Sequence, residues 1–236
     1  MRRRATVGGQ AERNIILVRL EDRISLVKLK VKRKLKELPS YSEELGLNLG
    51  EPKDRFKWFL ASMLFAKRIS AEIAKRTYME FERSGINTPE KILDAGWDKL
   101  VEILDSGGYV RYDFSTATKL LEVSKSLKEK YKSLENLYAS ANDSEDLEKR
   151  LLEFKGVGPT TINIFLRELR SVWEKANPTI SRLADDAAKK LGLEKKSEIK
   201  SLESQLVRLS LKYCKPQRCQ NCPVRNGCKE FRVHIS

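Results

Sequence analysis

The chain has 236 residues, with 47 Lys and Arg against 33 Asp and Glu, and a formal net charge of +14 at neutral pH. A chain of this length can bury a sizeable core as one large or two small domains. The positive excess favours a polyanionic partner such as nucleic acid; the alternative is a solvated surface rich in Lys and Glu, as thermophilic proteins carry. Because His234 is the single histidine, histidine catalysis and a histidine-rich metal site are excluded as leading interpretations.

The N-terminal stretch MRRRATVGGQAER is basic, and no apolar segment follows it, so we expect no secretory signal. The longest nearly apolar run, Trp58 to Ala66, is too short to cross a bilayer. We therefore expect a soluble, intracellular protein that is cytoplasmic (nucleoid-associated in a prokaryote), monomeric and without a membrane partner.

Capping signals and helical propensity predict an all-α chain, because no stretch shows sustained strand alternation. Ser70 and Thr88 are expected helix caps, the latter followed by Pro89, and Asp54 or a neighbour is expected to cap the helix before them. Residues 39–52 are expected to be a connector. In chain order, the expected helices cover 15–38, 55–70, 71–84, 89–95, 97–105, 111–131, 144–154, a helix opening at Thr161 and broken by Asn177-Pro178, 181–191 and 197–213.

Two details of these helices matter for function. The run 28–36 carries lysines that alternate with apolar residues, so a strand stays open there, and its charges would contact phosphates or form a solvated face. Trp58, Phe59 and Phe65 are interpreted as core residues and not as platforms for stacking bases.

The stretch Leu151 to Leu166, LLEFKGVGPTTINIFL, predicts a helix, a tight glycine turn and a second helix. Gly156 and Gly158 flank Val157, and two glycines so close allow a sharp turn and a close approach to a ligand. Free amides and the helix dipole favour an anion at the start of the second helix. The structural alternative is a capping glycine followed by a second core helix.

All four cysteines lie in one fifteen-residue window as C-x4-C-x2-C-x5-C. In a reducing compartment this spacing argues for a metal centre and against disulfides. A structural zinc site usually uses two C-x-x-C pairs, and a plant-type [2Fe–2S] site takes its fourth cysteine from farther away. The expected ligands are Cys214, Cys219, Cys222 and Cys228.

Together the hairpin and the cysteine loop resemble the endonuclease III-like helix-hairpin-helix (HhH-GPD) DNA glycosylases, over about residues 54–230. The hairpin of that superfamily reads L-x-G-V-G-x-x-T-A, and K-P-x-R-C-x-x-C-P opens a similar cysteine loop, although the first cysteine spacing here is shorter. The resemblance implies a [4Fe–4S] cluster, with zinc as the alternative. It also implies a two-lobed fold in which segment 1–53 packs with the C-terminal segment 176–236, beside a helical domain of 54–175.

The resemblance further implies that the chain binds double-stranded, damaged DNA and hydrolyses the N-glycosidic bond of a flipped base in base-excision repair. The residues expected to contact DNA, including one that would fill the gap near the flipped base, are Lys155, Gly156, Val157, Gly158, Thr161, Arg111, Lys215, Arg218 and Arg225, with Tyr109 and Tyr112 beside Arg111.

The catalytic positions depart from the pattern of the superfamily. The lysine of bifunctional members falls on Thr160, which cannot form a Schiff base, so the enzyme is expected to be monofunctional. The catalytic aspartate falls on Ser181, and the acids offered instead are Asp185 and Asp186, one turn further on. Two alternatives stay open: a bifunctional enzyme that uses a displaced lysine, Lys67 or Lys155, and a non-catalytic protein that recognises distorted DNA.

Overall fold

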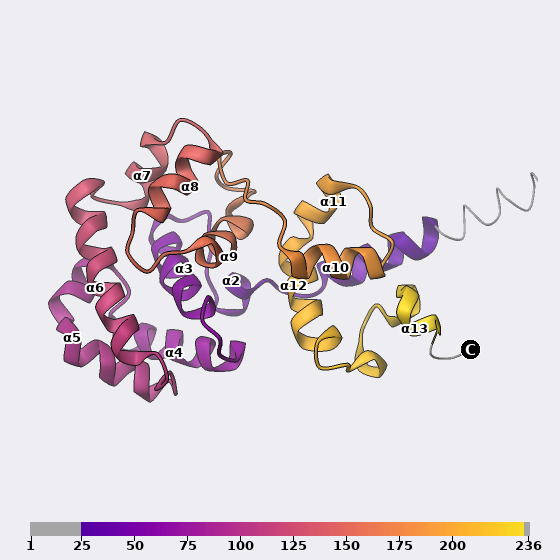
Figure 1. Cartoon of the computed structure of the whole chain (residues 1–236), viewed down its shortest axis with the longest axis horizontal. Coiled ribbons are helices and arrows are strands. Elements are labelled where there is room, and N and C mark those ends of the chain that lie inside the picture. Colours follow the sequence, from indigo (N-terminus) through magenta and orange to yellow (C-terminus); the bar gives the residue numbers. More distant parts are fainter. Residues whose placement is uncertain (1–24, 234–236) are drawn as a thin grey trace, which may run out of the picture. The chain divides into compact units, whose positions relative to one another are not determined.

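The structure, a computed structural model, describes residues 25–233, with the side chains of 232 and 233 left out. Within this range the chain is helical, with turns between the helices and no strand, which confirms the all-α prediction (Figure 1). None of the helices described is long and apolar enough to cross a membrane.

The chain divides into two compact units. One unit, which we call the hairpin unit, is Ser40–Ile180, and the other, the cysteine unit, joins the described residues 25–39 with residues 181–233. The segment 1–53 expected from the sequence is therefore divided: its described residues 25–39 fall in the cysteine unit and residues 40–53 in the hairpin unit. Likewise the second boundary lies at Ile180 and not at residue 175.

The hairpin unit packs its helices around a buried central helix, α3. Trp58 and Phe59 of α3 are fully buried, and Phe65 is partly buried against the same core, which confirms their interpretation as core residues. The Trp58 indole N–H donates to the carbonyl oxygen of Phe165 at 3.1 Å, so the burial of the ring leaves no polar group unsatisfied. The helices are α2 (Tyr41–Glu44), α3 (Pro52–Phe65), α4 (Ala71–Arg83), α5 (Pro89–Ser106), α6 (Asp113–Lys130), α7 (Leu134–Ser140), α8 (Ser144–Leu152) and α9 (Pro159–Leu169).

Most of the helix starts follow from local chemistry. The hydroxyls of Ser70 and Thr88 accept from the backbone amides of Ile73 and Lys91, as the capping signals predict. The prediction that Asp54 caps α3 is wrong, because α3 begins earlier, at Pro52, and the Asp54 carboxylate instead accepts from the amide of Asn48 at 3.0 Å. Proline suits the first helical turn, where an amide would have no partner.

The helix α2 was not predicted from the sequence, and local and tertiary contacts both support it. Locally, the Ser40 hydroxyl accepts from the amide of Glu43, and the Glu43 carboxylate accepts from the amide of Ser40. The amides of Tyr41 and Ser42 at the start of α2 donate to the Glu168 carboxylate of α9, so a distant residue completes this short helix.

The expected helix before Pro178 ends early, at Leu169. Beyond it the chain turns so that Trp173 is buried and stacks on Tyr138 of α7, with ring centroids 4.6 Å apart. Burial of Trp173 and its stacking on the partly buried Tyr138 outweigh a further helical turn.

The expected helices 89–95 and 97–105 meet at a kink inside α5. Gly96 has φ +72 there, a left-handed conformation that glycine adopts without strain. The two helical segments are therefore confirmed, with Gly96 as the break between them.

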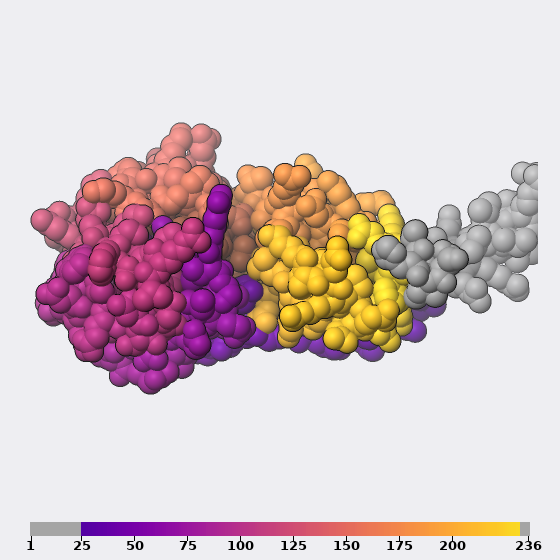
Figure 2. Space-filling model, turned by 60° about the horizontal axis from the view of Figure 1, so that its bottom comes forward, coloured from indigo at the N-terminus to yellow at the C-terminus, as the bar shows by residue number. Residues whose placement is uncertain are grey.

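The cysteine unit begins, within the described range, with a helix over residues 25–36. Val31 and Leu35 of this helix are buried one turn apart, which confirms the helix and rules out the strand; the expected part 15–24 lies outside the described residues. The C-terminal residues, yellow in the space-filling view, form exposed surface of this unit (Figure 2). The remaining elements are α10 (Arg182–Lys190), α11 (Lys196–Ser201), α12 (Glu203–Leu209), a π-helical turn η1 (Ser210–Cys214), 3-10 turns η2 (Cys219–Asn221) and η3 (Arg225–Gly227), and α13 (Lys229–Val233).

The helix expected over 197–213 is broken at Leu202, which separates α11 from α12. Glu203 follows the break and is buried, and its carboxylate accepts from the amide of Ser181 at 2.8 Å. A buried carboxylate requires hydrogen-bond donors, and the start of α10 supplies one. This long-range contact carries no signal in the local sequence.

Candidate nucleic-acid interface and cysteine loop

Helices α8 and α9 and the residues between them form the predicted helix, turn and helix. Phe154 and Val157 of the turn are buried, and the Val157 amide donates to the Phe154 carbonyl at 3.0 Å. The turn is therefore anchored to the core by two apolar side chains. Gly156 lies between them with φ +95, a conformation that favours glycine.

The two glycines of the turn have different surroundings. A Cβ on Gly156 would lie 2.6 Å from Cγ and Cδ of Lys119 in α6, so the Lys119 side chain lies directly against this backbone. Gly158 has extended backbone, and a Cβ there would meet nothing within 4 Å. Gly156 is thus required by the fold, whereas Gly158 faces open space, where a ligand can approach the backbone.

The start of α9 leaves backbone amides available. Pro159 has no N–H, no side chain of the described residues caps the helix, and the first helical bond runs from Ile162 N to Gly158 O at 3.0 Å. The amides of Thr160 and Thr161 precede that bond, so they point out of the end of the helix. A helix start with free amides and a positive dipole end attracts an anion.

The side chains predicted to contact DNA in the hairpin divide into two groups. Val157 and Thr161 are 5% and 3% exposed, so their side chains belong to the core and only their backbone is offered to a ligand. Lys155 is exposed on the turn, and its ammonium pairs with Glu122 of α6 at 2.7 Å. The second carboxylate oxygen of Glu122 is buried without a hydrogen-bond partner among the described residues. The buried Thr161 therefore offers a ligand its backbone amide and not its hydroxyl.

Arg111 and Tyr109 follow the Gly107-Gly108 turn but differ in exposure. Arg111 is exposed, and its guanidinium lies 5.4 Å from the centroid of the Tyr112 ring. Tyr109 is buried, and its O–H donates to the carbonyl oxygen of Leu64 at 2.9 Å. Burial raises the pKa of Tyr109 well above its usual range. Tyr109 is thus a core residue and not the side chain that fills the gap of a flipped base.

Lys67 is affected by a lysine that the sequence did not pair with it. Lys67 follows α3, and Lys119 lies in α6 with its stem against the backbone of Gly156. Burial lowers the pKa of Lys67, and the positive charge of Lys119 lowers it further. Lys67 was a candidate for a displaced catalytic amine, whereas Lys119 was missed, because one lysine among several in α6 gives no sequence signal.

Asp185 and Asp186 lie in the first half of α10 and both form ion pairs within that helix. Asp185 pairs with Lys189 at 2.7 Å, and Asp186 lies 3.9 Å from the guanidinium of Arg182. Their position near the positive end of a helix is favourable for acids whatever their function.

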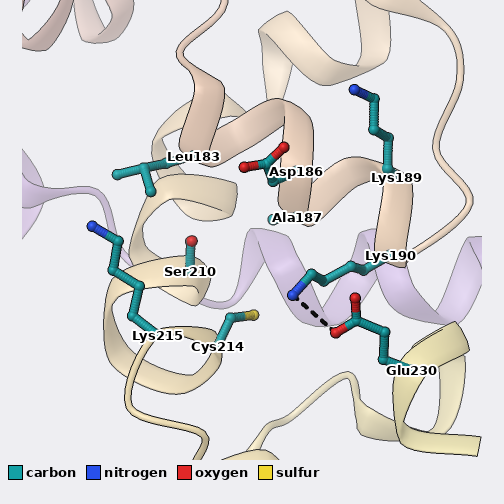
Figure 3. Close-up of a pocket in the computed structure, with 9 residues that line it drawn as sticks. All are labelled: Leu183, Asp186, Ala187, Lys189, Lys190, Ser210, Cys214, Lys215 and Glu230. Carbon is teal, nitrogen blue, oxygen red and sulfur yellow. Dashed lines mark ion pairs between the residues drawn. The ribbon is translucent and has the colours of Figure 1, made fainter. Parts of the chain in front are cut away.

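Asp186 differs from Asp185 in lining a pocket of about 380 Å³ in the cysteine unit. Figure 3 shows its carboxylate beside this pocket, with Cys214 and Lys215 on another wall. The Lys190 ammonium also lines the pocket and pairs with Glu230 at 2.9 Å. The pocket therefore brings together one residue from each of three predicted classes: catalytic acid, metal ligand and DNA contact.

Ser181, where the aspartate of the superfamily falls, caps α10, and its hydroxyl accepts from the amide of Ala184. The buried carboxylate at this place belongs to Glu203, which binds the Ser181 amide. Nothing in the sequence around Glu203 predicts its contact with the Ser181 amide, because the two residues are far apart in the chain.

The cysteine loop, residues 214–228, is a succession of turns. Backbone bonds join Cys222 N to Cys219 O at 3.1 Å and Cys228 N to Arg225 O at 3.0 Å. The Arg225 guanidinium donates to the carbonyl of Gln220, which ties the middle of the loop together. Val224 is the single buried residue of the loop, and the rest is exposed or half-buried.

The four cysteines are free thiols, and the charges of the other three act on Cys214. Burial raises the pKa of Cys214 to about 11, and burial also raises the pKa of Cys222. Four unpaired thiols this close in sequence fit a soft metal centre in their chemistry. In the described part of the chain, however, no three Cys, His, Asp or Glu residues are gathered as a metal-binding group. The donors thus fit, while their present arrangement does not enclose a metal.

Lys215, Arg218 and Arg225 are exposed in this loop, and none of them forms an ion pair with an acid of the described residues. Arg225 is engaged with the Gln220 carbonyl, so Lys215 and Arg218 are the cations of the loop that are available to a polyanion. Among the described residues, the basic loop and the open start of α9 are two places that favour an anion. No family model matches the chain, and no curated protein matches it.

Proposed function

We propose that this protein binds duplex DNA through the α8–α9 hairpin and acts as a monofunctional DNA glycosylase in base-excision repair. The observation that carries the proposal is the open start of α9. Pro159 has no N–H there, a Cβ on Gly158 would meet nothing within 4 Å, and no side chain of the described residues caps the helix. A phosphate oxygen would accept from the amides of Thr160 and Thr161 there. The net charge of +14 supports a polyanionic partner.

A glycosylase must take its target base out of the stack before it can reach the glycosidic bond. In hydrolysis, water adds to C1′ of the sugar, while the base leaves with the electron pair of the broken bond and a proton. A carboxylate stabilises the positive charge that develops on the sugar and assists the attacking water. We propose Asp186 for this role in preference to Asp185, because Asp186 lines a pocket and its ion pair is long, at 3.9 Å. The absence of a lysine at Thr160 supports base release without strand cleavage.

The experiment is an end-labelled duplex assay over oxidised, deaminated, alkylated and mismatched bases and an abasic site. Each duplex is read with and without hot alkali. We expect cleavage only after alkali, on one class of damaged or mismatched base. Strand breaks without alkali would contradict the monofunctional assignment, and no base release over the whole panel would contradict the glycosylase assignment.

DNA binding is tested separately with a matched pair of lysine variants, Lys155→Ala and Lys149→Ala. Both side chains are exposed and both pair with a glutamate, but Lys149 lies in α8 away from the turn. We expect Lys155→Ala to weaken binding to all duplexes and to reduce the slope of log affinity against log salt by about one, as for the loss of one phosphate contact. Equal effects of the two variants would contradict binding at the turn.

A second candidate function is a non-catalytic protein that recognises distorted DNA. It is favoured by the ion pairs that occupy both Asp185 and Asp186. Tight, lesion-selective binding without base release in the duplex assay would establish it in place of the glycosylase.

We further propose that Cys214, Cys219, Cys222 and Cys228 hold a [4Fe–4S] cluster, with zinc as the alternative. When bound, such a centre would supply a rigid support for the loop that carries Lys215 and Arg218. Iron and sulfide analysis of anaerobically purified protein tests this. A colourless protein that contains zinc would establish the alternative.

A further inference from the structure

The positive charge of the chain is divided unequally between the two units. The hairpin unit, residues 40–180, contains 22 Lys and Arg against 23 Asp and Glu. The described residues of the cysteine unit, 25–39 and 181–233, contain 19 Lys and Arg against 7 Asp and Glu. The long-range attraction for a polyanion therefore originates in the cysteine unit and not around the hairpin.

We propose that the exposed face of the helix over residues 25–36, indigo in Figure 1, binds the sugar-phosphate backbone of duplex DNA. This surface is additional to the hairpin and to the cysteine loop. The choice of DNA as the partner rests on the proposed function, whereas the surface itself rests on the charges and the packing of the helix.

The helix concentrates positive charge without acids to balance it. Lys30 lies three and four residues from Arg33 and Lys34, so these cations are neighbours on the helix surface and repel one another. Lys32 pairs with Glu198 at 2.8 Å, and no other cation of the helix forms an ion pair with an acid of the described residues. The sequence before the helix, residues 1–24, adds six Arg against three Asp and Glu and so brings no net negative charge. The cations of the helix are Lys28, Lys30, Lys32, Arg33, Lys34 and Lys36.

The packing of the helix decides which of these cations face outward. Val31 and Leu35 are buried, and a Cβ on Gly227 would collide with Val31, so this side of the helix lies against the backbone of the cysteine loop. By the helical period, the side opposite Leu35 carries Lys30, Arg33 and Lys34, all of them exposed. Three cations are thus held on one face of a packed helix before any partner binds, which reduces the ordering cost of binding.

The exposed face suits a nucleic-acid backbone better than a lipid surface. A helix that lies in a membrane interface presents apolar residues along the face that enters the lipid. Here the exposed large apolar side chains are Leu26 and Leu29, both near the start of the described helix, and the later ones, Val31 and Leu35, are buried. A duplex carries one phosphate charge about every 1.7 Å of its axis, which is dense enough to meet several cations of one helix face at once.

The pocket beside this helix is less favourable to a polyanion than its exposed face. Lys28, Lys32 and Lys195 line this pocket of about 310 Å³, but Glu194 and Glu198 line it too. Glu198 is already paired with Lys32. Acids therefore neutralise part of the pocket, whereas the face that carries Lys30 has none, and we assign the binding to that face.

The test compares two triple variants of the full chain. The helix triple is Lys30→Gln, Arg33→Gln and Lys34→Gln. The control triple is Lys99→Gln, Lys125→Gln and Lys149→Gln, at exposed lysines in α5, α6 and α8 of the hairpin unit. Both triples remove three positive charges and insert a good helix former, so they match in net charge and differ in the place of the change.

The measurement is the affinity for a short undamaged duplex over a range of salt concentrations. We expect the helix triple to bind at least about tenfold more weakly, and the slope of log affinity against log salt to fall by about 2–3, because each lost phosphate contact removes about 0.9. The control triple should keep the slope of the parent, and Lys30→Arg with Lys34→Arg should bind as the parent does. An unchanged slope in the helix triple, or an equal loss in both triples, would overturn the proposal.

Two further readings exclude a fold defect and a lipid partner. Urea unfolding should find the helix triple at least as stable as the parent, because the substitutions remove repulsion between like charges; a less stable helix triple would contradict that repulsion. Vesicles of phosphatidylserine and phosphatidylcholine are the second probe. Vesicle binding that the helix triple abolishes, with duplex binding unchanged, would overturn the assignment to DNA.

Failure of this surface and failure of the proposed function give different results. Weaker duplex binding by the helix triple but not by Lys155→Ala would support this surface and contradict binding at the hairpin. The reverse result would overturn this surface and leave the hairpin. Base release by the helix triple at the rate of the parent, with enzyme in saturating excess, would support a binding surface that is separate from the chemistry.

Discussion

The hairpin and the cysteine loop are both short, glycine-containing, basic segments, yet they are stabilised differently. The hairpin turn is anchored by the buried side chains of Phe154 and Val157, with buried residues of α8 and α9 on either side. The cysteine loop buries a single side chain, Val224. The hairpin therefore has core contacts that stabilise its shape, whereas the loop has few, and its shape would depend on the metal centre that we propose.

The largest effect is expected in the cysteine loop. Cys222→Ser should reduce bound iron more than about tenfold and lower the unfolding temperature of the cysteine unit, because metal binding supplies folding free energy where the core is small. Metal analysis and calorimetry measure this. Gln220→Ala, at an exposed side chain of the same loop, is the control and should keep its iron. Equal stability of the Cys222 variant and the parent would show that the loop is held without a metal.

The next effect concerns chemistry on α10. Asp186→Asn should slow base release about a hundredfold, the scale of a lost general acid or base, while Asp185→Asn should stay close to the parent. Both substitutions should change the free energy of unfolding by less than about 0.5 kcal/mol, because exposed ion pairs contribute little. Single-turnover kinetics and urea unfolding check this pair. A reversed order of the two rates would move the catalytic role to Asp185.

The two glycines of the hairpin provide the third prediction. Gly156→Ala should lower the free energy of unfolding by about 1–3 kcal/mol, because φ is +95 and the new methyl group would collide with Lys119. Gly158→Ala should leave stability within about 0.5 kcal/mol, since its Cβ meets open space.

Gly158→Ala should instead weaken duplex binding about tenfold, because a methyl group would keep phosphate away from the start of α9. Denaturant unfolding and a binding titration together separate the two glycines. If Gly158→Ala binds DNA as the parent does, the phosphate is not held at this helix start.

The smallest effect is a pH dependence set by Lys67, whose pKa is lowered in the folded state by burial and by Lys119. At neutral pH both states carry the charge and the folded state bears the repulsion. As pH rises through the folded pKa toward the ordinary value of 10.5, the folded state loses its proton first, so stability should rise in that window. Urea unfolding over this range should show the parent gaining stability relative to Lys67→Met. The difference between the two proteins cancels the opposite contributions of Tyr109 and Cys214, whose raised pKa values lower stability at alkaline pH.

The local sequence determined the elements whose signals are short-range. Ser70, Thr88 and Gly96 marked helix starts and a break that the structure confirms, because capping bonds and a left-handed φ act within a few residues. The hairpin was also predicted, since its glycines and apolar residues lie in one segment. The cysteine ligands were predicted from spacing alone, and the [4Fe–4S] cluster and the glycosylase function remain predictions.

Tertiary structure decided what depends on residues far apart in the chain. Glu168 completes α2, and Glu203 binds the amide of Ser181, through contacts that no local pattern encodes. The exposure of each candidate residue also depends on tertiary packing, which buries Tyr109 and the Thr161 side chain in the core. Lys119 lies against the backbone of Gly156 only because α6 and the hairpin turn pack together. A sequence orders charges along a line, whereas the electrostatic cost of bringing two of them together arises only when the chain has folded.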